Sequence, residues 1–289
     1  QGNTNEMGGD IAPITVIRGV LRQVVSQGFH YSYPQRPWPS MMPSQRPPAL
    51  SARRQTRGMT MHDAHTQRTR LLGGYWFNGL PVALQDALLH AASLRQLSAG
   101  QSLFRRGDPP CGLYAVLSGA MRIGAVNPAG KEALLTLVEA PNWFGEISLF
   151  DGQPRTHDAS AEGPLTLLHI PQASLQRLLG AEPQHWRDFA LLLSQKLRLA
   201  FIALEDMSLL PAAPRLARRL LQMAEGYGES SHSRRVLQLP QEQLALMLAI
   251  SRQTTNQILK ELQAQGIVQL AYGEIEILDL QRLQQAAQA

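Results

Sequence analysis

The sequence predicts an α+β protein: an antiparallel β domain, then one long helix, then a helical domain that ends in a β-hairpin. Three observations support this. Short apolar runs punctuated by Gly and Pro fill residues 101–170, apolar positions recur at helical spacing from 186 to 207, and two helical patterns precede an alternating run within 240–278. A chain of 289 residues is long for one compact domain and comfortable for two.

The first 70 residues differ in composition from the rest. Residues 31–57 are dense in Pro, Ser and Arg and show no sustained period, so we expect residues 1–70 to form a mostly disordered extension. Residues 1–70 hold nine arginines and the acidic residues Glu6, Asp10 and Asp63, for a charge of +6. Since the whole chain has a net charge of +5, residues 71–289 carry 5 − 6 = −1. Because the positive charge lies outside the folded part, DNA binding must be argued from local charge placement.

The single cysteine, Cys111, excludes an internal disulfide and the thiolate sets of an iron–sulfur cluster or a structural zinc site. We therefore expect Cys111 to be a small packing residue in a reducing compartment, the cytoplasm. No apolar run approaches the ~20 residues that span a bilayer. The composition predicts a soluble protein without an iron–sulfur cluster.

Residues 71–182 are expected to form the β domain. A helix comes first, since Leu84, Leu88 and Ala91 recur at helical spacing. The runs "GLYAVLSGAMRIGAV", "EALLTLV" and "PLTLLHIP" then predict short strands joined by tight turns. Such strands fit a small antiparallel barrel or jelly roll.

Residues 183–210 are expected to form the long helix, which Pro183 opens and Pro211 follows. Its apolar residues alternate by four and three and form a coiled-coil seam: Trp186, Ala190, Leu193, Leu197, Ala200, Leu204 and Met207. A helix that packs only within its own domain usually has a broader apolar stripe. The seam therefore favours a homodimer contact, with packing inside the chain as the alternative.

Residues 211–289 show the pattern of a winged helix-turn-helix, a fold that binds double-stranded DNA. Pro240 opens one helix, Ser251 is placed to cap the next, and Gly266 is placed to end it. Two alternating strands then flank Tyr272 and Gly273.

The helix after Ser251 carries the candidate DNA contacts. Arg pairs with guanine and Gln or Asn with adenine through paired hydrogen bonds, which makes base-reading candidates of Arg252, Gln253, Asn256 and Gln257. Short hydroxyls and a lysine suit phosphate oxygens, so the expected phosphate contacts are Ser251, Thr254, Thr255 and Lys260. The alternative is that these residues form only a solvated polar face. The preceding helix and the following hairpin favour the DNA-binding interpretation over it.

The segment "FGEISLFDGQPRT", residues 144–156, is a candidate anion site. Amides of a helical turn beginning at Gly145 and Glu146, with the charge of Arg155 and the hydroxyl of Thr156, suit a phosphate. Glu146 would repel that phosphate but can accept hydrogen bonds from sugar hydroxyls. The alternative from spacing alone is an internal Glu146–Arg155 salt bridge that closes a loop.

From about Trp76 to Asp279 the chain resembles the Crp/Fnr family of bacterial transcription regulators. The resemblance rests on "RRGDPPCGLYAVLSGAMRI", "FGEISLFDGQPRT" and "SRQTTNQILKELQAQGIVQL", which stand in the family's order. It implies a homodimer with a cyclic-nucleotide-binding β-roll, a dimerisation helix and a winged helix-turn-helix, and with DNA and RNA polymerase as partners.

The resemblance also implies roles for individual residues. Arg155 would bind the cyclic phosphate and Glu146 the ribose 2′-hydroxyl, within a phosphate-binding cassette of Gly145, Glu146, Ile147, Ser148, Arg155 and Thr156. Arg252, Gln253 and Gln257 match base-reading positions. Ala200 and Phe201 stand where the cyclic-AMP-binding type has a hydroxyl pair for adenine, which puts recognition of the base in question.

Several other functions stay open at this stage. The pocket could be vestigial, or hold a cyclic dinucleotide or haem, although His90, His157 and His169 show no haem-binding spacing. A nucleotide-binding module that regulates a protein partner has no reason to carry residues 240–278. An enzyme is not expected, because His157 and Asp158 would point to opposite faces of a strand and no motif marks a nucleophile.

Overall fold

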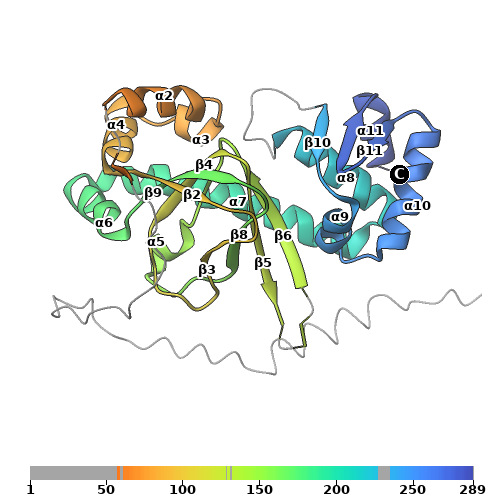
Figure 1. Cartoon of the computed structure of the whole chain (residues 1–289), viewed down its shortest axis with the longest axis horizontal. Coiled ribbons are helices and arrows are strands. Elements are labelled where there is room, and N and C mark those ends of the chain that lie inside the picture. Colours follow the sequence, from red (N-terminus) through yellow and green to blue (C-terminus); the bar gives the residue numbers. More distant parts are fainter. Residues whose placement is uncertain (1–56, 59–60, 128, 131, 227–234, 289) are drawn as a thin grey trace, which may run out of the picture. The chain divides into compact units, whose positions relative to one another are not determined.

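The computed structural model describes residues 57–58, 61–127, 129–130, 132–226 and 235–288 (Figure 1). Most of the expected extension, 1–70, lies outside these residues. Its last part is a strand, β1 (Arg57–Gly58), and a helix, α2 (Met61–Leu71), rather than disordered chain. Helix α2 is anchored because Leu71 is fully buried and Arg68 pairs with Asp86. Its polar sequence carries almost no apolar period, which is why sequence alone did not reveal it.

The β-roll begins with helices α3 (Tyr75–Asn78) and α4 (Val82–Ala91). The strands are β2 (Ser93–Leu97), β3 (Ser102–Phe104), β4 (Leu113–Ser118), β5 (Ala120–Val126), β6 (Glu132–Glu139), β7 (Trp143–Phe144), β8 (Asp158–Ala161) and β9 (Leu165–Ile170), with the short helix α5 (Ile147–Asp151) between β7 and β8. They form two antiparallel sheets, of order β1-β2-β9-β4-β7 and β3-β8-β5-β6. The predicted antiparallel β architecture is confirmed.

Strand β4 shows how the β-roll is packed. Side chains alternate across a strand, and here both faces are covered, so five successive residues are buried. Leu113, Ala115 and Leu117 pack in one cluster with residues of the surrounding helices. Tyr114 and Val116 face a second cluster, which contains side chains from both sheets. This second cluster lies next to the candidate anion segment, because Phe144 belongs to it.

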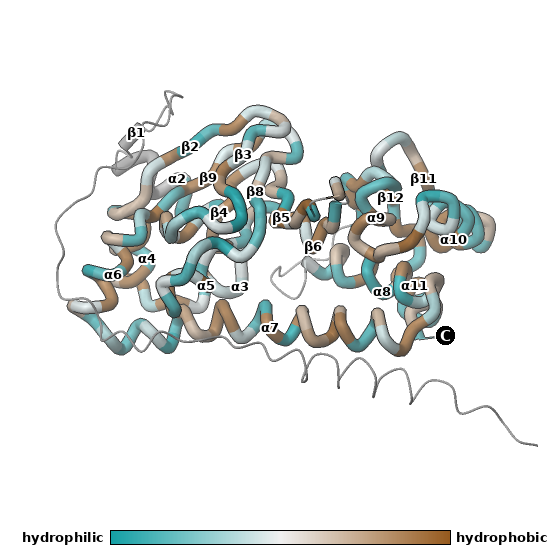
Figure 2. Tube along the Cα trace, turned by 90° about the horizontal axis from the view of Figure 1, so that it is seen from below, coloured by the Kyte–Doolittle hydropathy of each residue, from teal (hydrophilic) through white to brown (hydrophobic). Residues whose placement is uncertain are grey.

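Helix α6 (Gln172–Ala181), which was not predicted, and the 3-10 turn Pro183–His185 lead into α7 (Trp186–Leu209), the long helix that the sequence predicts. Figure 2 shows hydrophobic residues recurring along α7. Phe189 and Leu192 are buried within the chain. In contrast, Leu197, Leu204 and Met207 of the predicted seam are each more than half exposed. The helix thus has one apolar stripe packed within the chain and another that faces solvent.

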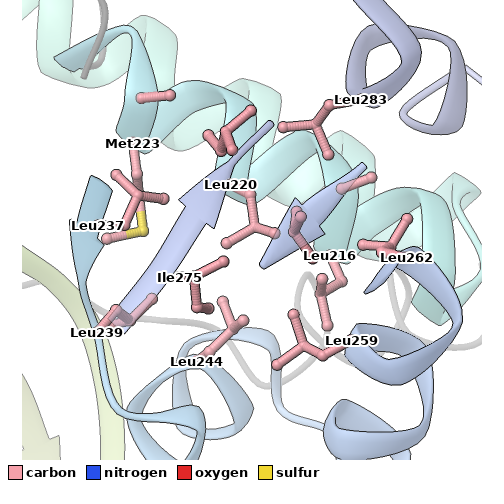
Figure 3. Close-up of a cluster of buried hydrophobic side chains, with 14 of the residues drawn as sticks. Leu216, Leu220, Met223, Leu237, Leu239, Leu244, Leu259, Leu262, Ile275 and Leu283 are labelled. Atoms are coloured by element: carbon pink, nitrogen blue, oxygen red, sulfur yellow. The ribbon is translucent and has the colours of Figure 1, made fainter. Parts of the chain in front are cut away.

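The C-terminal domain consists of α8 (Ala212–Ala224), β10 (Val236–Gln238), α9 (Gln241–Leu248), α10 (Arg252–Ala264), β11 (Val268–Ala271), β12 (Glu274–Ile277) and α11 (Leu280–Ala286). Its strands form a sheet of order β10-β12-β11. Leu220, Leu244, Leu259 and Ile275 meet in one buried core (Figure 3). The predicted helix-turn-helix and hairpin are confirmed. No helix in the described parts of the chain is both long and apolar enough to cross a membrane.

Candidate functional site

The candidate anion segment is shaped by two glycines. Gly145 follows β7 with a φ of 99°, and Gly152 ends α5 in the left-handed region with a φ of 64°. A side chain on Gly145 would place its Cβ 2.9 Å from the Gly112 carbonyl oxygen and 3.0 Å from Nη1 of Arg155. At Gly152 a Cβ would meet nothing within 4 Å. Gly145 is therefore needed both for its backbone conformation and for the approach of Arg155.

Arg155 is 4% exposed. Its Nη1 donates to the Gly145 carbonyl at 2.8 Å, and its Nη2 donates to the Gly112 carbonyl at 2.5 Å and to Cys111 Sγ at 3.1 Å. The guanidinium also lies 4.6 Å from the centre of the Phe104 ring. Its Nε–H is buried and meets no acceptor among the described residues. A buried donor without a partner is costly, so an anion at this edge of the guanidinium would stabilise it.

Glu146 is 3% exposed and is paired with α7. Lys196 Nζ donates to Glu146 Oε2 at 2.8 Å and also to the Trp143 carbonyl. The alternative Glu146–Arg155 salt bridge is not found among the ion pairs of the described residues, because each group has other partners. Glu146 therefore joins the segment after β7 to the long helix.

The other predicted effector residues differ in exposure. Ile147 is 41% exposed, whereas Ser148 is buried. Thr156 is exposed, and its hydroxyl lies 2.9 Å from Nδ1 of His157. Burial and then the positive charge of Arg106 lower the pKa of His157, although Asp158 acts in the opposite direction. His157 is thus predominantly neutral at pH 7, which removes the additional positive charge that a protonated ring would bring to this site.

Ala200 and Phe201 are exposed on α7, four and five residues after Lys196. Residues four apart share a helix face, so Ala200 lies on the same side of α7 as the lysine that holds Glu146. Neither side chain can donate a hydrogen bond to a base.

Sequence reasoning missed two partners at the site. Lys196 could have been found from the sequence, because it is a lysine beside the seam and lies four residues before Ala200. Cys111 gave no such signal: it packs against the cluster of Phe104, Tyr114 and Phe144, as a small packing residue would, and its Sγ also accepts from Arg155 Nη2. Burial and the neighbouring Cys111 raise the pKa of Tyr114, so its hydroxyl stays protonated and donates to Cys111 Sγ at 3.1 Å.

Replacing Gly145 with alanine should destabilise the protein by about 1–3 kcal/mol, because left-handed strain adds to a close backbone contact. Gly152→Ala is the matched control, since it has a left-handed backbone in open space and should cost about 1 kcal/mol. Urea unfolding of both variants measures the difference. Equal losses of unfolding free energy in the two variants would show that the close contact at Gly145 does not contribute to stability.

The candidate DNA-contacting helix α10 begins as predicted. Ser251 caps it by accepting a hydrogen bond from the Thr254 amide at 3.0 Å. Arg252, Gln253 and Gln257 are exposed, while Asn256 is half-buried. Lys260 is exposed on the same helix. The opposite side packs into the domain core through Ile258, Leu259 and Leu262.

The structure corrects the prediction for Thr255. This residue is fully buried, and its hydroxyl donates to the Ser251 carbonyl at 3.1 Å. Thr255 therefore cannot reach a phosphate, and its role is to tie the helix to its cap. Thr254 is half-exposed, and its hydroxyl lies 2.7 Å from that of Ser251.

With this geometry in view, comparison with known proteins defines the class. A cyclic nucleotide-binding domain model matches residues 94–182, and a Crp-like helix-turn-helix domain model matches residues 214–286. The chain thus combines an effector domain with a DNA-binding domain. It belongs to the CRP/FNR family of transcription regulators. The expectation that it is not an enzyme agrees with this family, which consists of transcription regulators.

Three relatives illustrate the match. The cyclic AMP receptor protein of Thermus thermophilus is 30% identical over 216 residues, 74% of this chain and 97% of the relative. The CRP-like cAMP-activated global transcriptional regulator of Mycobacterium tuberculosis is 29% identical over 213 residues, 73% of this chain and 95% of the relative. A solved structure of a CRP/FNR-family regulator, also from Thermus thermophilus, matches with a TM-score of 0.55 and 29% identity, covering 68% of this chain and 98% of that one.

Proposed function

We propose that this protein is a homodimeric, sequence-specific DNA-binding regulator whose DNA binding is modulated by a cyclic nucleotide, with RNA polymerase as its partner in transcription. The observation that carries the DNA-binding part is the exposure of Arg252, Gln253 and Gln257 on a capped helix whose other side is buried. Side chains in this arrangement can reach base edges in a major groove.

The effector part of the proposal rests on the surroundings of Arg155 and Glu146. The unpaired Nε–H of Arg155 suits a phosphate oxygen, and an Nη1 hydrogen remains besides the one given to Gly145. The Glu146 carboxylate can accept from a ribose hydroxyl. Two relatives are named for cyclic AMP, which makes cyclic AMP the first ligand to test.

Helix α7 is the proposed route from effector to DNA. A ribose hydroxyl that bonds to Glu146 competes with Lys196 for the same carboxylate. Lys196 belongs to the helix whose exposed stripe is the proposed dimer contact. A change in that ion pair would therefore alter how α7 is held, and with it the relative placement of the two recognition helices.

Isothermal titration with cyclic AMP and cyclic GMP tests the effector, together with DNA binding by the same preparations. The DNA is a palindromic duplex selected from a random library by the purified protein. Absence of binding heat with either nucleotide, with DNA affinity unchanged by both, would contradict control by these ligands.

Arg155→Ala should weaken cyclic nucleotide binding by about tenfold or more, because a charged hydrogen bond contributes about 1.5–3 kcal/mol. Titration of the variant measures this loss. The control is Arg177→Ala, which removes an exposed arginine of α6. Equal nucleotide affinity of the two variants would show that Arg155 does not bind the phosphate.

A ligand-independent regulator is the second candidate. It is favoured by the internal partners of Arg155, whose Nη groups already bond to Gly145, Gly112 and Cys111. In that case wild type binds DNA without nucleotide, and added nucleotide changes nothing. DNA affinity measured with and without cyclic AMP therefore separates the two candidates.

A further inference from the structure

The β5–β6 hairpin packs against the helix-turn-helix. Leu134 and Leu137 of β6 are 2% and 4% exposed, and they belong to the same buried cluster as Leu216 of α8 and Leu244 of α9. The two β6 residues are three apart, a spacing that would put them on opposite faces of a regular strand. Their common face therefore needs an irregularity in β6.

A β-bulge at Leu135 supplies that irregularity. Gly124 pairs with Leu134 and Ile123 pairs with Thr136, so Leu135 is the extra residue. A bulge disturbs the hydrogen-bond ladder of its strand. Here Arg219 of α8 donates to the Leu135 carbonyl at 2.8 Å. The irregular strand thus offers both apolar side chains and a backbone acceptor to the DNA-binding domain.

A polar contact continues the same surface. Gln243 of α9 is 6% exposed, and its Nε2 donates to Glu162 Oε1. The second carboxylate oxygen of Glu162 accepts from Arg122 Nη1 at 3.0 Å, and Arg122 also pairs with Glu132. Glu162 is therefore held in place from the β-roll side and presents a fixed acceptor to Gln243.

This contact leaves the DNA-reading surface free. Arg252, Gln253 and Gln257 stay exposed, whereas the buried residues of α9 are Gln243, Leu244, Ala245 and Leu248. The contact therefore does not occlude DNA. It instead limits how far the helix-turn-helix can rotate against the β-roll of its own chain.

We propose that Gln243 and Glu162 are positioning residues, which dock the helix-turn-helix on the β-roll beside the β5–β6 hairpin and pre-orient it for a two-half-site operator. The proposal rests on the proposed function of a dimeric DNA binder. Two recognition helices must enter the major groove about one helical turn, ~34 Å, apart. Orientations that are fixed before binding do not have to be ordered on DNA, which strengthens binding. A single half-site requires no such relation between the two helices.

Gln243→Glu tests the proposal, because it places a second carboxylate against Glu162 in a largely buried contact. Affinity for a selected palindromic duplex should fall about tenfold, since a helix-turn-helix that undocks more often must be ordered on binding. Affinity for a duplex with one half-site should stay within about twofold. Hydrogen exchange of β6 and α9 amides should become faster, because the contact opens more often.

Two variants serve as controls. Gln241→Glu adds the same charge two positions earlier, which is a different face of α9, and should not reproduce the loss. The exchange pair Glu162→Gln with Gln243→Glu restores a carboxylate–amide pair, and should recover palindrome binding to within about threefold of wild type.

Three results would overturn the inference: unchanged palindrome binding by Gln243→Glu, a parallel loss on the half-site duplex, or no recovery in the exchange pair. Failure of the proposed function is distinguishable, because the wild-type protein itself would then select no duplex from the library.

Discussion

Arg252→Ala is expected to weaken binding to a selected palindromic duplex by about 100-fold or more. A paired arginine–guanine contact contributes about 1–3 kcal/mol of discrimination, and the proposed dimer makes the contact twice. The loss should be small on a scrambled duplex, where Arg252 contributes only its charge. Because Arg252 is exposed at the start of α10, the free energy of unfolding should change by less than about 0.5 kcal/mol.

Fluorescence anisotropy with both duplexes at several salt concentrations measures this effect. Arg282→Ala is the matched control: it removes an exposed arginine of the same domain, which donates to the Gln265 carbonyl. Lys260→Ala should weaken both duplexes alike and reduce the salt dependence, as expected for a phosphate contact. If Arg252→Ala shows this uniform pattern too, Arg252 is a phosphate contact rather than a base-reading residue.

The predictable parts of the fold are those set by local chemistry. Pro240, Ser251 and Gly266 act on their own backbone, so the start of α9 and both ends of α10 could be predicted from the residues alone. The short apolar runs punctuated by Gly and Pro likewise identified β4 and β9. These signals need no knowledge of where distant segments meet.

The helical period could also have predicted the burial of Thr255. It lies three, four and seven residues before Ile258, Leu259 and Leu262, which places it on their face. Its hydroxyl suggested a phosphate contact, but its position on the buried face of α10 keeps that hydroxyl away from DNA. Thr255 can be buried despite its polar hydroxyl, because the Ser251 carbonyl accepts the hydrogen of that hydroxyl.

The partners of Arg155 and Glu146 could not be predicted in this way. Two acceptors of Arg155 are backbone carbonyls, which any residue can provide. Lys196 is 50 residues from Glu146, and their contact depends on how α7 packs on the β-roll. The sequence identifies the charged residues of the site, whereas the tertiary structure determines the hydrogen-bond and ion-pair partners of each.

The same packing separates the two apolar stripes of α7. Phe189 and Leu192 are covered within the chain, so their burial is accounted for by one protomer. Leu197, Leu204 and Met207 continue the seam but are 52%, 60% and 52% exposed. A three-four pattern of exposed apolar residues is what a two-stranded coiled coil buries. This stripe is the proposed homodimer surface.

Replacing both Leu197 and Leu204 with glutamate should convert the proposed dimer into a monomer of 31.9 kDa. Two carboxylates in each helix would face their counterparts across a desolvated seam, which opposes association. Light scattering coupled to size exclusion measures the mass. Palindrome affinity should fall about 100-fold or more, because the second half-site no longer binds as part of the same molecule.

Arg198→Ala is the control for this prediction, since it changes the charge of an exposed residue next to Leu197 but off the seam and should leave the protein dimeric. The double variant should retain its affinity for a single half-site, because the cluster around Leu244 and Leu259 does not include the seam. A double variant that stays dimeric would show that the proposed seam is not the interface. A monomeric variant with full palindrome affinity would show that DNA binding does not depend on this dimer.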